Sequence, residues 1–415
     1  MSQFRFAPIA LLLAAIGLNM APALVGVVGV AHAEAMRPEL GKPLQEAQGM
    51  MKNKKYKEAL AKIREADAVG NKTPAEVVMI ERMRASAAAS SGDTATAMRS
   101  YEAVVESGKL PAGEQLKYIQ QVIDIAYRNR DYAKTIQWIN RYQKDGGTDP
   151  AMQSLLVQTY YLNGSYALAL KEVQATVRAE EKSGRAPTEE QLQLLANCAS
   201  KTGDKVGYAN AMEKLVAYYP KKDYWAQLLN RVQAKPGFSD RLSLDVYRLK
   251  LAVGQLTSTN DYMEMSQLAL QSGFPAEAVK IIDQAYKSGA MGTGTDAARH
   301  QRLRDLANKS AAENLKESTQ SEAEAAQSKD GTGMVNLGYA YVTAGKFDKG
   351  IPLMEQGIRK GDLKRPDDAK LHMGIAYLLA GKKGPAVQTF RTVQGTDGTA
   401  DLARYWVMQS NRPIS

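Results

Sequence analysis

Apolar residues recur three or four positions apart along most of the chain, and glycines interrupt these runs at regular distances. This spacing places the apolar side chains on one face of a helix. The pattern is clearest near the carboxyl end, where the stretch from Asn336 to Phe347 is matched 36 residues later by the stretch from His372 to Lys383. Each stretch predicts a helix that ends at a glycine and is followed by a second helix.

The glycines in these two stretches have distinct expected roles. Gly338 and Gly374 lie where the two helices of a pair approach closely, since a larger side chain there would push the helices apart. Gly345 and Gly381 follow the first helix, where a left-handed residue ends it. The side chains that we expect to pack inside the two helix pairs are Tyr341, Met354, Tyr377 and Phe390.

The same frame continues upstream and gives eight matching units, with one doubtful unit between Trp225 and Leu256. The pattern resembles the tetratricopeptide repeat, whose period is about 34 residues. The resemblance covers most of residues 38–395 and implies an all-α fold, an α-solenoid of stacked helix-turn-helix hairpins. It also implies protein–protein interaction, and exported bacterial members of the family often serve envelope assembly or transport systems.

Capping signals support the positions of the helices. Thr73 with Glu76 and Thr188 with Gln191 have the capping-box spacing, and Pro150 follows Asp149 at another expected start. Taken together, the patterns predict five segments: 1–33, a signal peptide; 38–290, an amino-terminal repeat array; 291–330, a charged helical spacer; 331–395, a carboxyl-terminal pair of repeats; and 399–412, a capping helix.

The amino-terminal segment predicts export. Residues 6–31 contain no charged side chain, Arg5 precedes them, and Ala31-His32-Ala33 has the small-x-small pattern of a cleavage site. We therefore expect a signal peptide cleaved after Ala33 and a periplasmic mature chain with no membrane span. The apolar run is also long enough to span a bilayer if it is retained. A membrane-tethered assembly factor is accordingly the alternative.

The net charge of +10 could favour nucleic acid, anionic lipid or acidic proteins. Export argues against nucleic acid. The basic clusters fall at expected turns, where they are typical of a solvated surface. These clusters are Lys52, Lys54, Lys55 and Lys57; Lys221 and Lys222; and Lys382 and Lys383.

Few residues are suited to catalysis or metal binding. The single cysteine, Cys198, lies on an apolar helix and is expected to be a buried small hydrophobe. His300 and His372 are far apart and form neither a triad nor a zinc site at a known spacing. We therefore expect no enzyme activity, no metal and no cofactor. An envelope hydrolase with an unrecognised carboxylate site stays open, and it predicts that one Asp or Glu replacement abolishes activity without unfolding.

The predicted architecture favours binding of a peptide or partner protein on the concave face, which the first helix of each hairpin lines. Polar and aromatic side chains occupy the expected face, although the same residues could be ordinary exposed helix positions. The family's carboxylate clamp for peptide carboxyl termini has no match. The predicted peptide-binding residues are Arg82, Lys117, Gln120, Asp124, Tyr127, Arg128, Ser154, Gln158 and Tyr161.

Overall fold

The computed structural model describes residues 37–412, and all regular secondary structure within that range is helical. The predicted all-α fold is therefore confirmed. The predicted signal peptide lies outside the described residues. The described chain divides into two compact units, residues 37–169 and 170–412, with the boundary inside helix α8.

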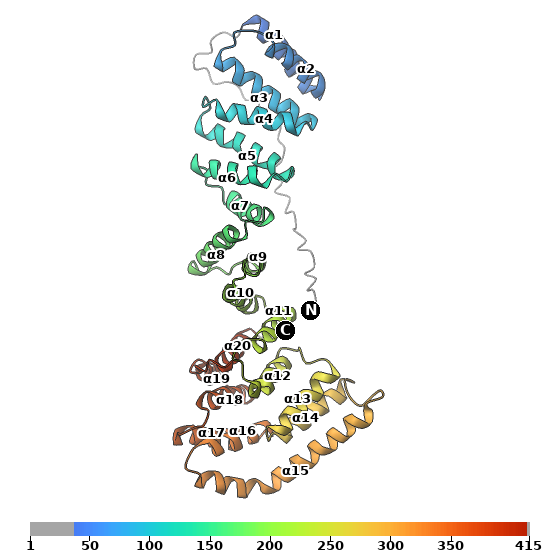
Figure 1. The fold of residues 1–415 in the computed structure, drawn as a ribbon, viewed down its shortest axis with the longest axis vertical. Helices are drawn as coiled ribbons and strands as arrows, with labels where there is room; N and C mark the ends of the chain where they lie inside the picture. The colour runs from blue at the N-terminus through green and yellow to red at the C-terminus, as the bar shows by residue number, and fades with distance from the viewer. Residues whose placement is uncertain (1–36, 413–415) are drawn as a thin grey trace. The chain divides into compact units, whose positions relative to one another are not determined.

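Unit 1 is a stack of antiparallel helices in which each helix packs against the next along the chain (Figure 1). Short turns of a few residues join them, as in an α-helical hairpin array. Its helices are α1 (Pro38–Lys52), α2 (Tyr56–Asp67), α3 (Pro74–Ser91), α4 (Thr94–Glu106), α5 (Ala112–Arg128), α6 (Tyr132–Lys144), α7 (Pro150–Leu162) and the start of α8 (Tyr166–Lys182).

A continuous hydrophobic core runs through unit 1 and holds neighbouring hairpins together. Small residues such as Ala85 and Ala88 on α3 are completely buried, which allows the helices to lie close together. Larger aliphatic side chains, including Ile63 and Ile123, fill the remaining space. Burial of such side chains is the main stabilising contribution in a helical array, at about 1.5–3 kcal/mol for each large one.

Unit 2 begins with hairpins of the same kind and then closes on itself. Its last helix packs against α10, α12, α18 and α19. The remaining helices are α9 (Glu189–Lys201), α10 (Lys205–Tyr218), α11 (Lys222–Gln233), the 3₁₀ helix η1 (Asp240–Leu242), α12 (Ser243–Ala252), α13 (Thr259–Gln271), α14 (Pro275–Lys287), α15 (Ala297–Gln327), α16 (Thr332–Thr343), α17 (Phe347–Lys360), α18 (Pro366–Leu379), α19 (Lys383–Phe390) and α20 (Thr399–Asn411).

The glycine roles predicted for the carboxyl-terminal hairpins are confirmed. A Cβ on Gly338 would come within 2.7 Å of the Gly350 carbonyl oxygen on the facing helix, and one on Gly374 would meet the Phe390 ring at 2.4 Å. Gly345 ends its helix with φ of 85°, in the left-handed region. The α16–α17 hairpin therefore depends on direct contact between backbones, and the α18–α19 hairpin on the packing of the Phe390 ring against Gly374.

Helix α15 is the single long helix expected in the charged stretch, and it packs against α14 and α16. Leu303 and Ala307 near its start are buried, as is Ala325 near its end. Residues 312–317 between them are exposed on every side. The middle of the helix is therefore exposed between two buried attachment points.

The predicted helix caps are confirmed at three starts. The Thr73 and Thr188 side chains form complete capping boxes, and the Asp149 side chain accepts a hydrogen bond from the backbone nitrogen of Ala151. The predicted division of the chain into five segments stays a prediction. Within residues 37–412, no helix combines the length and the apolar character needed to cross a membrane.

Candidate functional site

The predicted peptide-binding residues all lie in unit 1, on the first helices of three consecutive hairpins. Arg82 is on α3, and Ser154, Gln158 and Tyr161 are on α7. The others occupy one face of α5, at positions 117, 120, 124, 127 and 128. The buried face of the same helix carries Ile119, Val122, Ile123 and Ala126.

Several of these side chains are held by neighbours. The Arg82 Nε donates a hydrogen bond to the Tyr118 hydroxyl at 2.8 Å, and the same guanidinium pairs with Glu114, which joins α3 to α5. The Arg128 Nε donates to the Asp124 carboxylate at 3.0 Å. These groups are therefore fixed in position before any ligand arrives.

Other members of the set remain available for contact. The side chains of Lys117 and Gln158 are exposed, and Gln120 is partly exposed. None of these three makes a side-chain hydrogen bond within the part of the chain that the structure describes. The α5 face thus combines fixed charged groups with free polar ones, which is an arrangement suited to peptide binding.

Burial changes the acid–base properties of two residues on this face. It raises the pKa of Asp124 above its ordinary value, although the neighbouring Arg128 opposes the change. It also raises the pKa of Tyr127, whose ring meets Tyr132 edge-on with 6.1 Å between centroids. Tyr161 and Tyr166 form a similar edge-on pair at 5.3 Å. A half-buried carboxylate beside tyrosine rings offers a recognisable contact for a donor group of a ligand.

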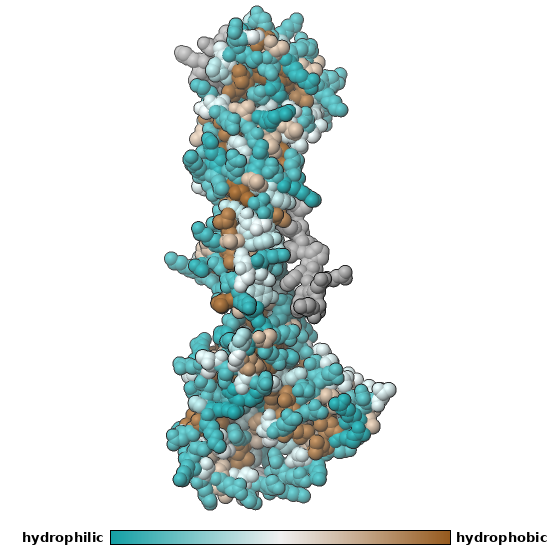
Figure 2. Space-filling model, viewed as in Figure 1, coloured by the Kyte–Doolittle hydropathy of each residue, from teal (hydrophilic) through white to brown (hydrophobic). Residues whose placement is uncertain are grey.

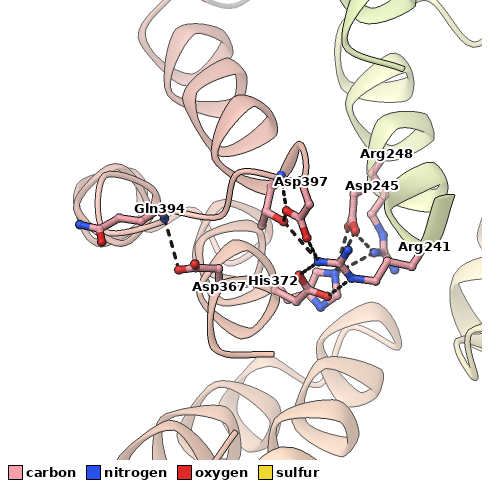
Figure 3. Close-up of polar contacts among 9 residues, drawn as sticks. Arg241, Asp245, Arg248, Asp367, His372, Gln394 and Asp397 are labelled. Carbon is pink, nitrogen blue, oxygen red and sulfur yellow. Dashed lines mark hydrogen bonds and ion pairs between the residues drawn. The ribbon is translucent and has the colours of Figure 1, made fainter. Parts of the chain in front are cut away.

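A second polar arrangement lies in unit 2 and is buried. The Arg248 guanidinium donates through Nε and Nη2 to the Glu277 carboxylate at 2.8 and 2.6 Å. It also donates through Nη1 to Asp245 at 2.7 Å (Figure 3). His372 Nε2 lies 3.0 Å from the same Asp245 oxygen. Helices α12, α14 and α18 thereby meet at one charged cluster, which we call the Arg248 cluster.

Burial and charge act in opposite directions inside the Arg248 cluster. Burial alone would raise the pKa of Asp245, but His372 and Arg248 hold this pKa well below its ordinary value. Burial would lower the pKa of Arg248, but Glu277 raises it well above its ordinary value. Both groups are therefore charged at neutral pH, and each depends on its partner to remain so.

Aromatic rings enclose the Arg248 cluster. The Arg248 guanidinium lies 4.9 Å from the centroid of Tyr339 and 5.1 Å from that of Phe274. The Tyr339 ring in turn stacks on His372 at 4.5 Å. Tyr339 and His372 belong to the first helices of the last two hairpins, α16 and α18. These hairpins accordingly direct aromatic side chains into contacts with the chain itself.

Arg241, beside the Arg248 cluster, binds two carboxylates from the carboxyl-terminal region. It contacts Asp368 at 2.6 Å and Asp397 at 2.6 Å, both through Nη2 (Figure 3). Burial would raise the pKa of Asp397, but hydrogen bonds from Thr399 and Arg241 lower it to about 2. This pairing attaches η1 to α18 and to the segment before α20.

The Arg248 cluster has a histidine and a carboxylate but no nucleophile in contact with them. Cys198 is buried elsewhere on α9, as predicted, and burial raises the pKa of its thiol to about 11, which leaves it protonated. His300 accepts a hydrogen bond from the backbone nitrogen of Gly292 at 3.1 Å. Across residues 37–412, no group of three or more histidine, cysteine or acidic side chains is placed to hold a metal ion.

Sequence reasoning missed the Arg248 cluster. It treated His372 only as a residue of a repeat helix, and it found no repeat match for the stretch that contains Asp245 and Arg248. The available signal for a buried charged cluster was a pair of charged residues, Asp245 and Arg248, three positions apart within an apolar run. Their partners lie 29–127 residues away in the chain.

Comparison with known proteins identifies the repeats. Residues 335–398, which span α16 to α19, match the model of a family described as tetratricopeptide repeat. No curated protein matches the chain.

Solved structures of tetratricopeptide proteins also match. They include the TPR2AB domain of yeast Sti1 in complex with pHSP90, at 12% identity over 72% of this chain and 98% of that one, with a TM-score of 0.24. Yeast Tom70 matches at 11% identity over 90% of this chain and 95% of that one, with a TM-score of 0.24. A tetratricopeptide repeat protein from Parabacteroides merdae matches at 11% identity over 70% of this chain and 98% of that one, with a TM-score of 0.23.

Proposed function

Since residues 335–398 of this chain are tetratricopeptide repeats, we propose that the protein is a non-catalytic interaction scaffold of the cell envelope. It binds a peptide or partner protein on the face formed by α3, α5 and α7 of unit 1. The tetratricopeptide repeat generally serves as a protein-interaction module, which supports the scaffold function.

The exposure of the α5 face is the observation that carries the choice of binding site. Lys117 and Arg128 are exposed there, while Asp124 and Tyr127 between them are half-buried. A row of partly buried anchors with exposed neighbours is characteristic of protein-binding surfaces.

The last two hairpins lack a comparable exposed row. Tyr339 is buried against Phe274 and Arg248, and Asp368 is paired with Arg241. A peptide would have to displace these contacts before it could bind to α16 or α18. The exposed face in unit 1 is therefore the better candidate.

The binding site is tested by a double replacement, Asp124→Ala with Tyr127→Ala. Both side chains project from the proposed face, so capture of a partner from an envelope extract by the immobilised chain should fall by about tenfold or more. Far-ultraviolet circular dichroism of the variant should stay helical, because the buried face of α5 is unchanged. Mass spectrometry identifies the captured protein.

A matched control replaces Glu106 and Gln137, two exposed residues at the end of α4 and within α6. The variant Glu106→Ala with Gln137→Ala should capture the partner as well as the unchanged chain does. Equal capture by both double variants would refute the proposed face.

The envelope location is tested by the mass of the chain recovered from cells. A chain that begins at Glu34 would support cleavage after Ala33 and a periplasmic scaffold. Recovery of a chain that retains residues 1–33 in the membrane fraction would instead support the tethered alternative, and recovery in the cytoplasm would refute export.

A further inference from the structure

The turns of unit 1 alternate between two edges of the stack, because successive helices are antiparallel. The α1–α2, α3–α4, α5–α6 and α7–α8 turns share one edge, and the α2–α3, α4–α5 and α6–α7 turns share the other (Figure 1). A contact of the Lys134 Nζ, at the start of α6, with the Met98 sulfur of α4 joins two of the turns on the first edge.

The two edges differ in charge. The first edge, residues 49–60, 88–99, 125–136 and 159–169, carries eight basic and three acidic side chains. The second edge, residues 37–41, 63–78, 102–116 and 140–153, carries six basic and nine acidic ones. We call the first the basic turn edge. Its basic residues are Lys52, Lys54, Lys55, Lys57, Arg99, Arg128, Arg130 and Lys134.

Helix dipoles do not explain this difference. Each edge contains the carboxyl ends of some helices and the amino ends of the next, so the partial charges at the helix ends largely cancel. The charge of the basic turn edge therefore comes from its side chains alone.

Most of these basic side chains lack an acidic partner. Arg128 pairs with Asp124 and Lys134 with Glu102, but the other six make no ion pair with any residue that the structure describes. All six are exposed. On the second edge, by contrast, Arg37 pairs with Glu76 and Arg141 with Asp145. An uncompensated row of charge attracts anions over about 8–10 Å at physiological salt.

Amphipathic and apolar side chains lie along the same edge. The tyrosine pair Tyr127 and Tyr132 stands at the α5–α6 turn, and Tyr161 with Tyr166 stands at the α7–α8 turn. Leu168, in the first turn of α8, is 48% exposed. Tyrosine is enriched where protein meets the membrane interface, because its ring is apolar and its hydroxyl is polar.

We propose that the basic turn edge of unit 1 docks on an anionic lipid surface. Four of the six uncompensated charges lie at the α1–α2 turn, and one each lies near the α3–α4 and α5–α6 turns. They do not converge on a pocket, which suits an extended negative surface better than a single peptide. Four of the six uncompensated residues are lysines, which act as point charges and do not need the bidentate geometry that arginine offers to bases and phosphates. Lipid headgroups beside tyrosine rings match this combination.

The proposal is tested by binding of the full chain to vesicles of phosphatidylcholine with or without phosphatidylglycerol. The triple variant that combines Lys52→Gln, Lys55→Gln and Lys57→Gln should bind the anionic vesicles at least about tenfold more weakly than the unchanged chain does. A control variant removes the same charge from the second edge, with Arg64→Gln, Lys109→Gln and Lys144→Gln. This control should stay within about twofold of the unchanged chain, and added salt should weaken binding.

Residues 1–31 are the same in the unchanged chain and in both variants, so any insertion by them cancels when the three proteins are compared. Equal binding to both vesicle types would overturn the proposal, as would an equal loss in the two variants. Tighter binding to polyglutamate or single-stranded DNA than to anionic vesicles would also overturn it, in favour of an acidic protein or nucleic acid. Partner capture through α5 should be unchanged in both variants, so the two proposals fail independently.

Discussion

At Gly338 the absence of a side chain allows helices α16 and α17 to lie close together. A Cβ there would lie 2.6 Å from the Met354 Cγ and 2.7 Å from the Gly350 carbonyl oxygen. We expect Gly338→Ala to lower the free energy of unfolding by about 1–3 kcal/mol, because backbone atoms cannot move aside as a flexible side chain can. Urea denaturation followed by circular dichroism measures the change.

Gly333 provides the control on the same helix. A Cβ there would make only ordinary contact, at 3.5 Å from the Ala325 Cβ. Gly333→Ala should leave stability unchanged or raise it by about 0.5–1 kcal/mol, since alanine favours the helix. Equal destabilisation by the two replacements would show that close approach is not the reason for glycine at 338.

Within the Arg248 cluster, we expect replacement of Asp245 to lower the free energy of unfolding most. Asp245→Asn leaves the buried Arg248 with one carboxylate partner and should lower the free energy of unfolding by about 3–5 kcal/mol at pH 7. An exposed control, Asp305→Asn, should change it by less than about 0.5 kcal/mol. Urea midpoints of the two variants test this difference.

The effect of Asp245 should also depend on pH. Its pKa in the folded chain is below the ordinary value of about 3.9. The stability that it contributes is therefore complete above about pH 4 and is lost as the pH falls through the lower folded value. The difference in stability between the unchanged chain and Asp245→Asn should shrink between pH 7 and pH 3. A constant difference would contradict a charged Asp245.

The sequence predicted the residues whose roles are local and missed those whose partners are distant. Gly345 and Thr73 act within one turn of helix, so their types and spacing were sufficient. Arg248 acts on Glu277, and Asp245 on His372, across 29 and 127 residues. No periodic pattern links such positions, since only the closure of unit 2 brings them together.

At the scale of elements, α15 combines buried positions near its ends with an exposed middle. Residues 312–317 are exposed on all sides, whereas Leu303 and Ala307 are buried. Because the middle buries so little side-chain surface, it should open at a lower free energy than the ends. We expect backbone amides of residues 312–317 to exchange with deuterium at least about tenfold faster than those of residues 303–307.

Helices α14 and α16 provide the reference for this exchange measurement, because they pack on the two ends of α15. Their amides should exchange as slowly as those of residues 303–307. Uniform protection along α15 would mean that something else supports the middle of the helix.

Most helices of the chain could be predicted from periodicity, glycines and caps, including the long α15. The stretch around α11, η1 and α12 matched no repeat, and its helices differ from a regular hairpin by the inserted 3₁₀ turn. The predicted binding residues do share a face in unit 1, and whether they bind a partner stays a prediction. The pairing of Arg82 with Glu114 joins two helices and has no sequence signal, whereas the i,i+4 spacing of Asp124 and Arg128 was an available signal for their pairing.

At the scale of the whole chain, the two units use the same kind of hairpin differently. Unit 1 leaves the α5 face exposed, while unit 2 buries Tyr339 and pairs Asp368 with Arg241. On the face seen in Figure 2, hydrophobic residues form small separate areas within a mainly hydrophilic surface. Recognition through this face should therefore depend on charged and polar groups more than on a large apolar patch.

The closure of unit 2 also has a consequence for how the chain assembles during synthesis. Arg241 pairs with a residue 127 positions later, and Glu213 with one 191 positions later. Helices α10 and α12 are synthesised well before the helices that pack against them, so their charged side chains stay exposed to water until then. In unit 1 each helix contacts its neighbours in the chain, so its side chains are not exposed in this way for long. Unit 1 should therefore fold as soon as its own helices are available, whereas unit 2 is completed only when the last helix is available.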